Sequence, residues 1–325
     1  MAIGDGFGYP TEFLSLDKIK ERWGKNGLEA PLGEPIMVTD DTQMAVAVAN
    51  ALQRAITDDL SKESITNALI KEFVTWLNDS RNDRAPGMTC LVATENLEKG
   101  LAWNLATVKD SKGCGANMRV VPVGLLTARN ISTEQIGRLA QFQAVITHAH
   151  PTALTASEIT AITIVKLING TEPENLLNEL ERHAKEQWRI YHDDLLAEIW
   201  NRPPFYTSQD YIAHGWDEVL EVLAKVRKAM EYRDEEIDPC LAVGDGWKAE
   251  DAFGTALYCF LLYPNDPAAA MRRAINSRGD SDSIGCLTGA MVGAHCGVEA
   301  IPPDWISRIE YQNELNEMVK FFSAS

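Results

Sequence analysis

Apolar residues recur every three to four positions along most of the chain, which is the spacing of amphipathic α-helices. The longest stretches with this pattern predict helices at 38–56, 63–80, 132–147, 152–169, 174–200, 216–234, 249–262, 266–276 and 304–322. The strict alternation of a half-buried strand is almost absent, and so is the spacing of strand–helix–strand units. The pattern therefore predicts an all-α protein.

Glycine and proline punctuate the chain between these helices. Connections are expected at 14–36, 81–90, 107–118, 201–215 and 239–247. Residues 1–13 hold three glycines at alternate positions, and we expect a loop there that allows a tight turn or close backbone approach. Internal repeats, low-complexity segments and a linker are all missing from the sequence. A single domain over residues 1–325 is expected.

The segment from Asn276 to Gly297 combines acidic residues with regularly spaced glycines. Asp280 and Asp282 precede a helical pattern whose glycines, at 285, 289, 293 and 297, fall on one helix face. An interior helical glycine costs about 1 kcal/mol relative to alanine, so we expect another helix to approach this face closely. The two aspartates fit either a helix N-cap or the mouth of a cation site.

A second acidic helix start lies about 240 residues earlier, at Thr39, Asp40 and Asp41. One N-cap needs one side-chain oxygen, and two adjacent carboxylates repel each other unless a cation or donor lies between them. Close packing on the glycine face would bring the two acidic starts together. Hard cations such as Mg²⁺ or Mn²⁺ prefer oxygen ligands, and a two-metal site could draw on Glu12, Thr39, Asp40, Asp41, Asp280, Asp282 and Ser283.

The formal charge of −17 argues against nucleic acid or an anionic membrane as the main partner. It does not exclude a small anion, because bound metals and backbone amides reverse the sign locally. The chain shows no signal-peptide pattern at its start, no uninterrupted run of 18 apolar residues and no CxxC pair. We expect a cytoplasmic protein with reduced cysteines, not bound to a membrane.

Several blocks of the sequence, taken in order, resemble those of the ADP-ribosylglycohydrolase family, which includes the dinitrogenase-reductase-activating glycohydrolases. They are GDGFGYPTEF, VTDDTQMAVAVANAL, RAPGMTC, GCGANMRVVPVGLL, THAHPTA, VGDGWKAEDAF and NSRGDSDSIGCLTGAMVGAHCG. The resemblance covers nearly the whole length. Ser283 departs from the family's usual threonine but keeps the hydroxyl. Arg278 stands where a small residue is common, and would either contact a phosphate or face solvent.

The resemblance implies a compact orthogonal bundle of helices with two Mg²⁺ ions, or Mn²⁺, held by the seven oxygen-bearing residues named above. It implies that Glu12, Asp41 and Asp280 take part in catalysis. A diphosphate is expected at Gly113, Gly115, Gly244 and Gly246. His148 or His150 would line the adenosine or ribose site. Asn117 would touch the leaving group or stabilise its loop, and Trp247 would wall the cleft or pack in the core.

The implied activity is hydrolysis of the bond between ADP-ribose and a mono-ADP-ribosylated protein by two-metal activation of water. The stretch Ala116–Arg119 looks more like the arginine-directed branch of the family than the serine-directed one. A monomer acting on an ADP-ribosylated protein is expected. Two alternatives stay open: an immunity protein that neutralises an ADP-ribosyltransferase toxin by hydrolysis or by occluding its active site, and a non-catalytic ADP-ribose-binding or structural relative.

Overall fold

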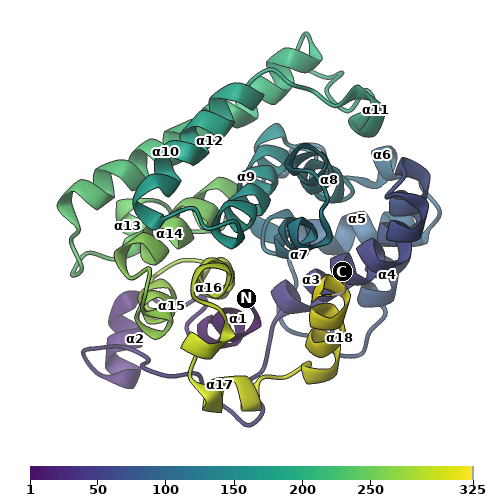
Figure 1. Ribbon diagram of the computed structural model, residues 1–325. Helices are drawn as coiled ribbons and strands as arrows, with labels where there is room; N and C mark the ends of the chain where they lie inside the picture. Colours follow the sequence, from purple (N-terminus) through teal and green to yellow (C-terminus); the bar gives the residue numbers. More distant parts are fainter. Residues whose placement is uncertain (324–325) are drawn as a thin grey trace.

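The computed structural model describes residues 1–323 and confirms the all-α prediction (Figure 1). Within these residues extended pairing is limited to three isolated bridges. The helices of the first half are α1 Ala2–Gly8, α2 Leu16–Trp23, α3 Asp40–Ala55, α4 Lys62–Leu77, α5 Met88–Glu98, α6 Trp103–Ala106, α7 Val121–Leu125, α8 Thr133–Val145 and α9 Pro151–Ile168. Those of the second half are α10 Pro173–Gln187, α11 Asp193–Leu196, α12 Ser208–Tyr232, α13 Pro239–Ala242, α14 Ala249–Leu262, α15 Pro267–Ile275, α16 Ser281–Cys296, α17 Pro303–Arg308 and α18 Gln312–Ser323.

Helix α9 forms the centre of the core, and α7, α8, α10, α12, α14 and α16 pack around it. It is long and apolar enough to cross a membrane by length and composition alone. However, 89% of the helix is buried inside the protein, as expected of a core helix. The buried apolar side chains form one cluster that extends from α1 to α18.

Helix α16 packs closely on α1, which comes from the opposite end of the chain (Figure 1). A Cβ added at Gly285 would lie 2.4 Å from the Gly4 carbonyl oxygen, and one at Gly4 would lie 1.9 Å from the Gly285 oxygen. The expected close approach to the glycine face is therefore present. Gly289 also faces α1, whereas Gly293 has open space beside it. Gly297 ends the helix with a φ of +78°.

Two expectations about this packing were wrong. The glycine-rich start of the chain is a helix, α1, and not a loop. The helix lying on the glycine face is α1, and the acidic α3 makes fewer contacts with α16. Glycine disfavours helix, but here its missing side chain allows two backbones to touch, and that packing offsets the weak local preference.

Other differences concern short helices. Helix α2 lies in the segment expected to be irregular, with Ser15 capping its start and Gly24 ending it. The single helix predicted at 304–322 is interrupted between α17 and α18, because the backbone of residues 308–310 bonds to Ile36 instead. The stretch 174–200 is likewise divided into α10 and α11, and α12 begins earlier than predicted, at Ser208.

Candidate metal centre

Three segments that are distant in sequence meet at the N-terminal end of α16. They are the turn after α1, the start of α3 and the start of α16 itself. Gly8 permits the contact, because a Cβ there would lie 2.3 Å from the Ser281 carbonyl oxygen. The Thr11 hydroxyl donates to Ser281 Oγ at 3.0 Å, and Ser281 Oγ donates to the Gly8 carbonyl at 3.1 Å. These bonds fix Glu12, the next residue, beside α16.

The structure brings Glu12, Asp280 and Asp282 into one cluster. One carboxylate oxygen from each lies within 4.8 Å of the others, a separation at which they could hold a metal ion. Asp280 and Asp282 are buried, and Glu12 is half-buried. The Ser283 amide donates to Asp282 Oδ1 at 3.0 Å and orients that carboxylate. The aspartates thus do not merely cap the helix, since the Asp280 side chain accepts no capping bond.

The start of α3 adds further oxygens to the same region. Thr39 caps the helix, with its Oγ1 accepting from the Asp41 amide at 3.3 Å. The Ser283 hydroxyl donates to Asp41 Oδ1 at 3.3 Å, which joins the starts of α3 and α16. Asp40 Oδ2 accepts from the Gly87 amide at 3.3 Å. Asp41 Oδ2 is buried and has no hydrogen-bond partner among the described residues.

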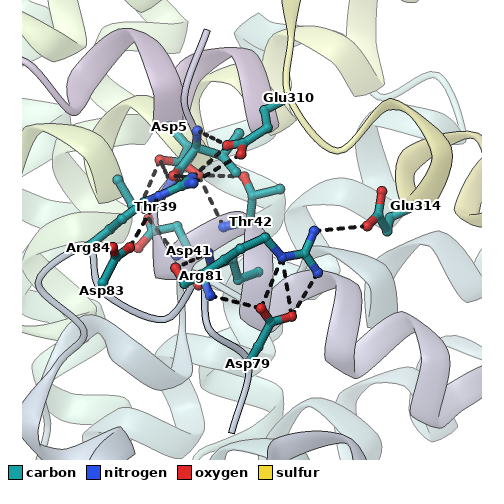
Figure 2. A network of polar contacts seen from close by, with 12 residues as sticks. Asp5, Thr39, Asp41, Thr42, Asp79, Arg81, Asp83, Arg84, Glu310 and Glu314 are labelled. Carbon is teal, nitrogen blue, oxygen red and sulfur yellow. Dashed lines mark hydrogen bonds and ion pairs between the residues drawn. The ribbon is translucent and has the colours of Figure 1, made fainter. Parts of the chain in front are cut away.

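Asp5 is a supporting residue that the sequence analysis missed (Figure 2). Its buried carboxylate accepts from the amides of Thr39 and Thr42 at 3.0 and 3.1 Å, and from both hydroxyls. These bonds hold the first turn of α3, and with it the Thr39 side chain, in place. The residue lies in a glycine-rich motif that was already singled out, but only the folded chain shows that its carboxylate is buried.

A salt bridge also holds the segment just before Thr39 (Figure 2). Arg84 donates to both carboxylate oxygens of Glu310, at 2.5 and 3.0 Å, and to the Val38 carbonyl. Glu310 in turn accepts from the Val38 amide at 3.2 Å. Glu310 and Arg84 together thus fix the amide and the carbonyl of Val38, the residue that leads into the acidic start of α3.

Burial and mutual repulsion strongly favour the neutral forms of these carboxyl groups. Burial, followed by the negative charge of Asp282, raises the pKa of Glu12 to about 9 and that of Asp5 to about 7. The same two causes, in the same order, raise the pKa values of Asp40 and Asp41 well above their usual range. So many buried carboxylates ionise together only if positive charge enters the cluster.

The donor set fits a hard divalent cation. All of the grouped atoms are carboxylate or hydroxyl oxygens, the ligands that Mg²⁺ and Mn²⁺ prefer. The buried, unpartnered Asp41 Oδ2 is the clearest sign of a missing counterpart, because buried polar atoms are normally bonded. A cation among these oxygens would satisfy that atom and offset the repulsion within the cluster.

Two glycine-bearing loops run side by side next to this cluster. The Cys114 amide donates to the Trp247 carbonyl at 3.1 Å, and Gly113 pairs with Lys248. Gly246 has a φ of +86°, and a Cβ there would lie 3.0 Å from the Asp280 Cβ. The Asp280 amide donates to the Asp245 carbonyl at 2.8 Å. The loop that contains Gly244 and Gly246 therefore packs directly against a residue of the acidic cluster.

A sequence model of the ADP-ribosylglycohydrolase family matches residues 1–325, the whole chain. The chain belongs to the ADP-ribosylglycohydrolase family. This confirms the resemblance drawn from the sequence blocks. A solved structure titled "ADP-ribosylglycohydrolase-related protein complex" shares the fold, with a TM-score of 0.66 and 22% identity. The match covers 99% of this chain and 93% of that one.

Named relatives are similar over most of their length. An ADP-ribosyl-[dinitrogen reductase] glycohydrolase from Rhodospirillum rubrum is 24% identical over 97% of this chain and 89% of its own. The ADP-ribosylarginine hydrolase Tri1 from Pseudomonas putida is 22% identical over 98% and 75%. The ADP-ribosylhydrolase ARH3 from Danio rerio is 24% identical over 88% and 76%.

The other predicted residues lie in different settings. Asn117 is fully buried and donates to the Ala249 carbonyl at 3.0 Å, which is the loop-stabilising role considered above. His148 is buried beneath Gly113 and Gly115, whereas His150 caps α9 by accepting from the Thr152 amide. Arg278 forms a partly exposed ion pair with Asp245 and so ties the second glycine loop to the segment before Asp280.

Trp247 lies at the surface beside the acidic cluster and not in the core. Its ring stacks on that of Phe13, with centroids 5.5 Å apart and an angle of 20° between the planes. Trp247 is 44% exposed and Phe13 is 65% exposed. Phe13 directly follows Glu12, and its φ of +61° is rare for a bulky residue. The pair forms an exposed aromatic surface next to Glu12 and Asp280.

Proposed function

We propose that this protein is a metal-dependent hydrolase that removes ADP-ribose from mono-ADP-ribosylated protein, with arginine as the modified residue. The main support is the cluster formed by Glu12, Asp280 and Asp282, which the start of α3 extends with a buried, unpartnered oxygen of Asp41. Family membership supplies the reaction class. The intact set of acidic residues favours an enzyme over a non-catalytic relative.

Two divalent cations, Mg²⁺ with Mn²⁺ as the alternative, would be held by the seven oxygen donors of the metal centre. These are Glu12, Thr39, Asp40, Asp41, Asp280, Asp282 and Ser283. When bound, such cations orient ribose hydroxyls and lower the pKa of water at the anomeric carbon. Asp5, Arg84 and Glu310 would keep the α3 ligands in position through their bonds to Thr39, Thr42 and Val38.

The reaction adds water across the bond from the ribose anomeric carbon to the guanidinium nitrogen and releases ADP-ribose and arginine. The water loses one proton, and the leaving nitrogen gains one. Glu12 is the least buried carboxyl of the cluster and borders the aromatic pair, so it is placed to transfer a proton on the open side. Asp41 and Asp280 are buried and would act by holding the cations.

Two observations favour arginine as the modified residue. A relative is named as an ADP-ribosylarginine hydrolase. The exposed Phe13–Trp247 pair offers flat aromatic faces beside Glu12, and a guanidinium group stacks well on such faces. The described residues contain no feature that specifically favours the toxin-neutralising alternative.

The test is release of ADP-ribose from an arginine-ADP-ribosylated protein, with Mg²⁺ or Mn²⁺ and with EDTA. Asp280→Asn and Asp41→Asn should each lower kcat/KM by more than about 100-fold, because loss of a group that only supports a metal ligand already costs 10- to 100-fold. Gly293→Ala, which changes an open position of the same helix, is the matched control. Wild-type rates in the aspartate variants would contradict the proposal.

A further inference from the structure

The ring of His148 lies beneath the first glycine loop and is 1% exposed. Its Nδ1 is 2.8 Å from Thr147 Oγ1, and its Nε2 has no hydrogen-bond partner in residues 1–323. A Cβ added at Gly115 would lie 3.3 Å from Nε2, and one at Gly113 would lie 3.6 Å away. Gly115 therefore lets the loop backbone pack on the histidine ring and on Cys90, whose Sγ would lie 2.6 Å from an added Cβ.

Thr147 receives a hydrogen bond from a buried arginine. Arg119 is fully buried, and its guanidinium donates to Thr147 Oγ1 at 2.8 Å. It also donates to Gln143 Oε1 and to the Gln143 carbonyl, at 2.8 and 2.9 Å. The ring of Phe73 lies 4.4 Å from the guanidinium carbon. No carboxylate of the described chain forms an ion pair with Arg119, so its buried charge lacks an anionic partner.

These contacts determine which nitrogen of His148 carries the proton. Arginine only donates, so Thr147 Oγ1 must accept from Arg119. The single hydroxyl hydrogen of Thr147 has one acceptor in reach among the described residues, Nδ1 of His148, and we infer that it is donated there. Nδ1 accepts, and the ring proton resides on Nε2. Burial, with a smaller contribution from the Arg119 charge, holds the pKa of His148 well below its usual range and keeps the ring neutral.

The same arginine also supports the glycine loop. Gln143 uses its Oε1 to accept from Arg119 and its Nε2 to donate to the Ala116 carbonyl at 2.8 Å. Arg119 thus braces the loop through Gln143 and the histidine through Thr147. The Nε2–H of His148 lies against the backbone of this loop, whose two glycines add no side chain of their own beside it, and such a donor suits an anionic oxygen.

We propose that Arg119 and Thr147 are positioning residues that hold His148 as an Nε2–H donor toward an anionic ligand oxygen at the loop containing Gly113 and Gly115. The inference rests on the proposed function in one respect, namely that this oxygen belongs to the diphosphate of ADP-ribose. Because the ring is neutral and its tautomer is fixed, the Nε2–H group donates a hydrogen bond to the ligand without adding a positive charge that would attract the carboxylates of the metal centre.

The tautomer can be read directly by ¹⁵N-edited NMR of the histidine rings in the Mg²⁺-loaded protein, with His148→Gln identifying the signals. The parent should show a protonated Nε2 and an unprotonated Nδ1. Thr147→Ser keeps the hydroxyl and should keep this pattern, whereas the isosteric Thr147→Val should lose it. A parent with its proton on Nδ1 would overturn the inference, whether or not Thr147→Val folds.

Binding of ADP-ribose, measured by calorimetry, tests the consequence. Thr147→Val should bind about tenfold more weakly than Thr147→Ser, with unchanged Mn²⁺ affinity. Equal ADP-ribose affinities for the two variants would overturn the inference even if the enzyme hydrolyses its substrate. Intact binding with the expected tautomer but no hydrolysis of any ADP-ribosylated protein would instead refute the proposed function alone.

Discussion

The contact between α1 and α16 can be tested with two alanine substitutions in one helix. Gly285 and Gly293 both lie inside α16, two helical turns apart. A Cβ at Gly285 would lie 2.4 Å from the Gly4 carbonyl oxygen and 2.7 Å from Ile275 Cγ2. A Cβ at Gly293 would meet no atom within 4 Å. The two positions differ in their surroundings but share the same change in helix preference.

The magnitude follows from that comparison. Alanine gains about 1 kcal/mol over glycine in a helix interior, and this gain is common to both variants. Overpacking costs about 1–3 kcal/mol, and the upper part of that range applies at Gly285, because backbone atoms cannot rotate away as a side chain would. Gly293→Ala should therefore be more stable than Gly285→Ala by about 2–3 kcal/mol.

Urea unfolding of the metal-free proteins would measure the difference. Gly285→Ala should also weaken Mn²⁺ binding, because α1 carries the turn that places Glu12 against Asp282. Gly293→Ala should bind Mn²⁺ as the parent does. Equal stability of the two variants would refute the conclusion that the glycines of α16 serve the approach of α1.

Three further predictions concern the centre and its surroundings. Asp5→Asn removes the charge and one accepting oxygen beside Thr39, so calorimetry should show Mn²⁺ affinity lowered about 10- to 100-fold; unchanged affinity would mean that Asp5 does not position the ligands. Trp247→Leu should lower kcat/KM on arginine-linked ADP-ribose about tenfold and leave kcat/KM on serine-linked ADP-ribose within about twofold. Equal losses on both substrates would show that the guanidinium group does not stack on the aromatic pair. In EDTA, folded Glu12 and Asp5, with pKa values of about 9 and about 7, hold protons that the unfolded chain releases near pH 4. The unfolded state therefore binds fewer protons above that pH, and thermal unfolding in EDTA should show stability falling as the pH rises from about 5 to about 8, with Mg²⁺ restoring it; stability that rises with pH would contradict this reasoning.

The helix starts and the family were predictable from the sequence because each is indicated by short stretches of neighbouring residues. Asp40 and Asp280 stand immediately at helix starts, where acidic and hydroxyl side chains form a recognisable pattern. Six of the long amphipathic segments also became helices close to the expected bounds, namely 38–56, 63–80, 132–147, 152–169, 249–262 and 266–276. Short helices such as α2 were missed, although Ser15 and Gly24 are ordinary start and stop signals.

Features that depend on tertiary contacts could not be predicted in this way. Local preference argues against a helix rich in glycine, so tertiary contacts such as those of Gly4 with Gly285 and of Gly8 with Ser281 explain α1. Asp5 resembles any other aspartate until its carboxylate is seen buried against Thr39 and Thr42. Asn117 had two interpretations in the sequence, and its burial against Ala249 became visible only in the fold.

The central claim is a metal-dependent hydrolysis, and one time course tests it most directly. Release of ADP-ribose from an arginine-ADP-ribosylated protein is followed with Mg²⁺, then after excess EDTA, and then after Mg²⁺ or Mn²⁺ is restored. We expect release, arrest and resumption in that order. Release that continues in EDTA, or no release from arginine-, serine- or O-acetyl-linked ADP-ribose with either metal, would contradict it.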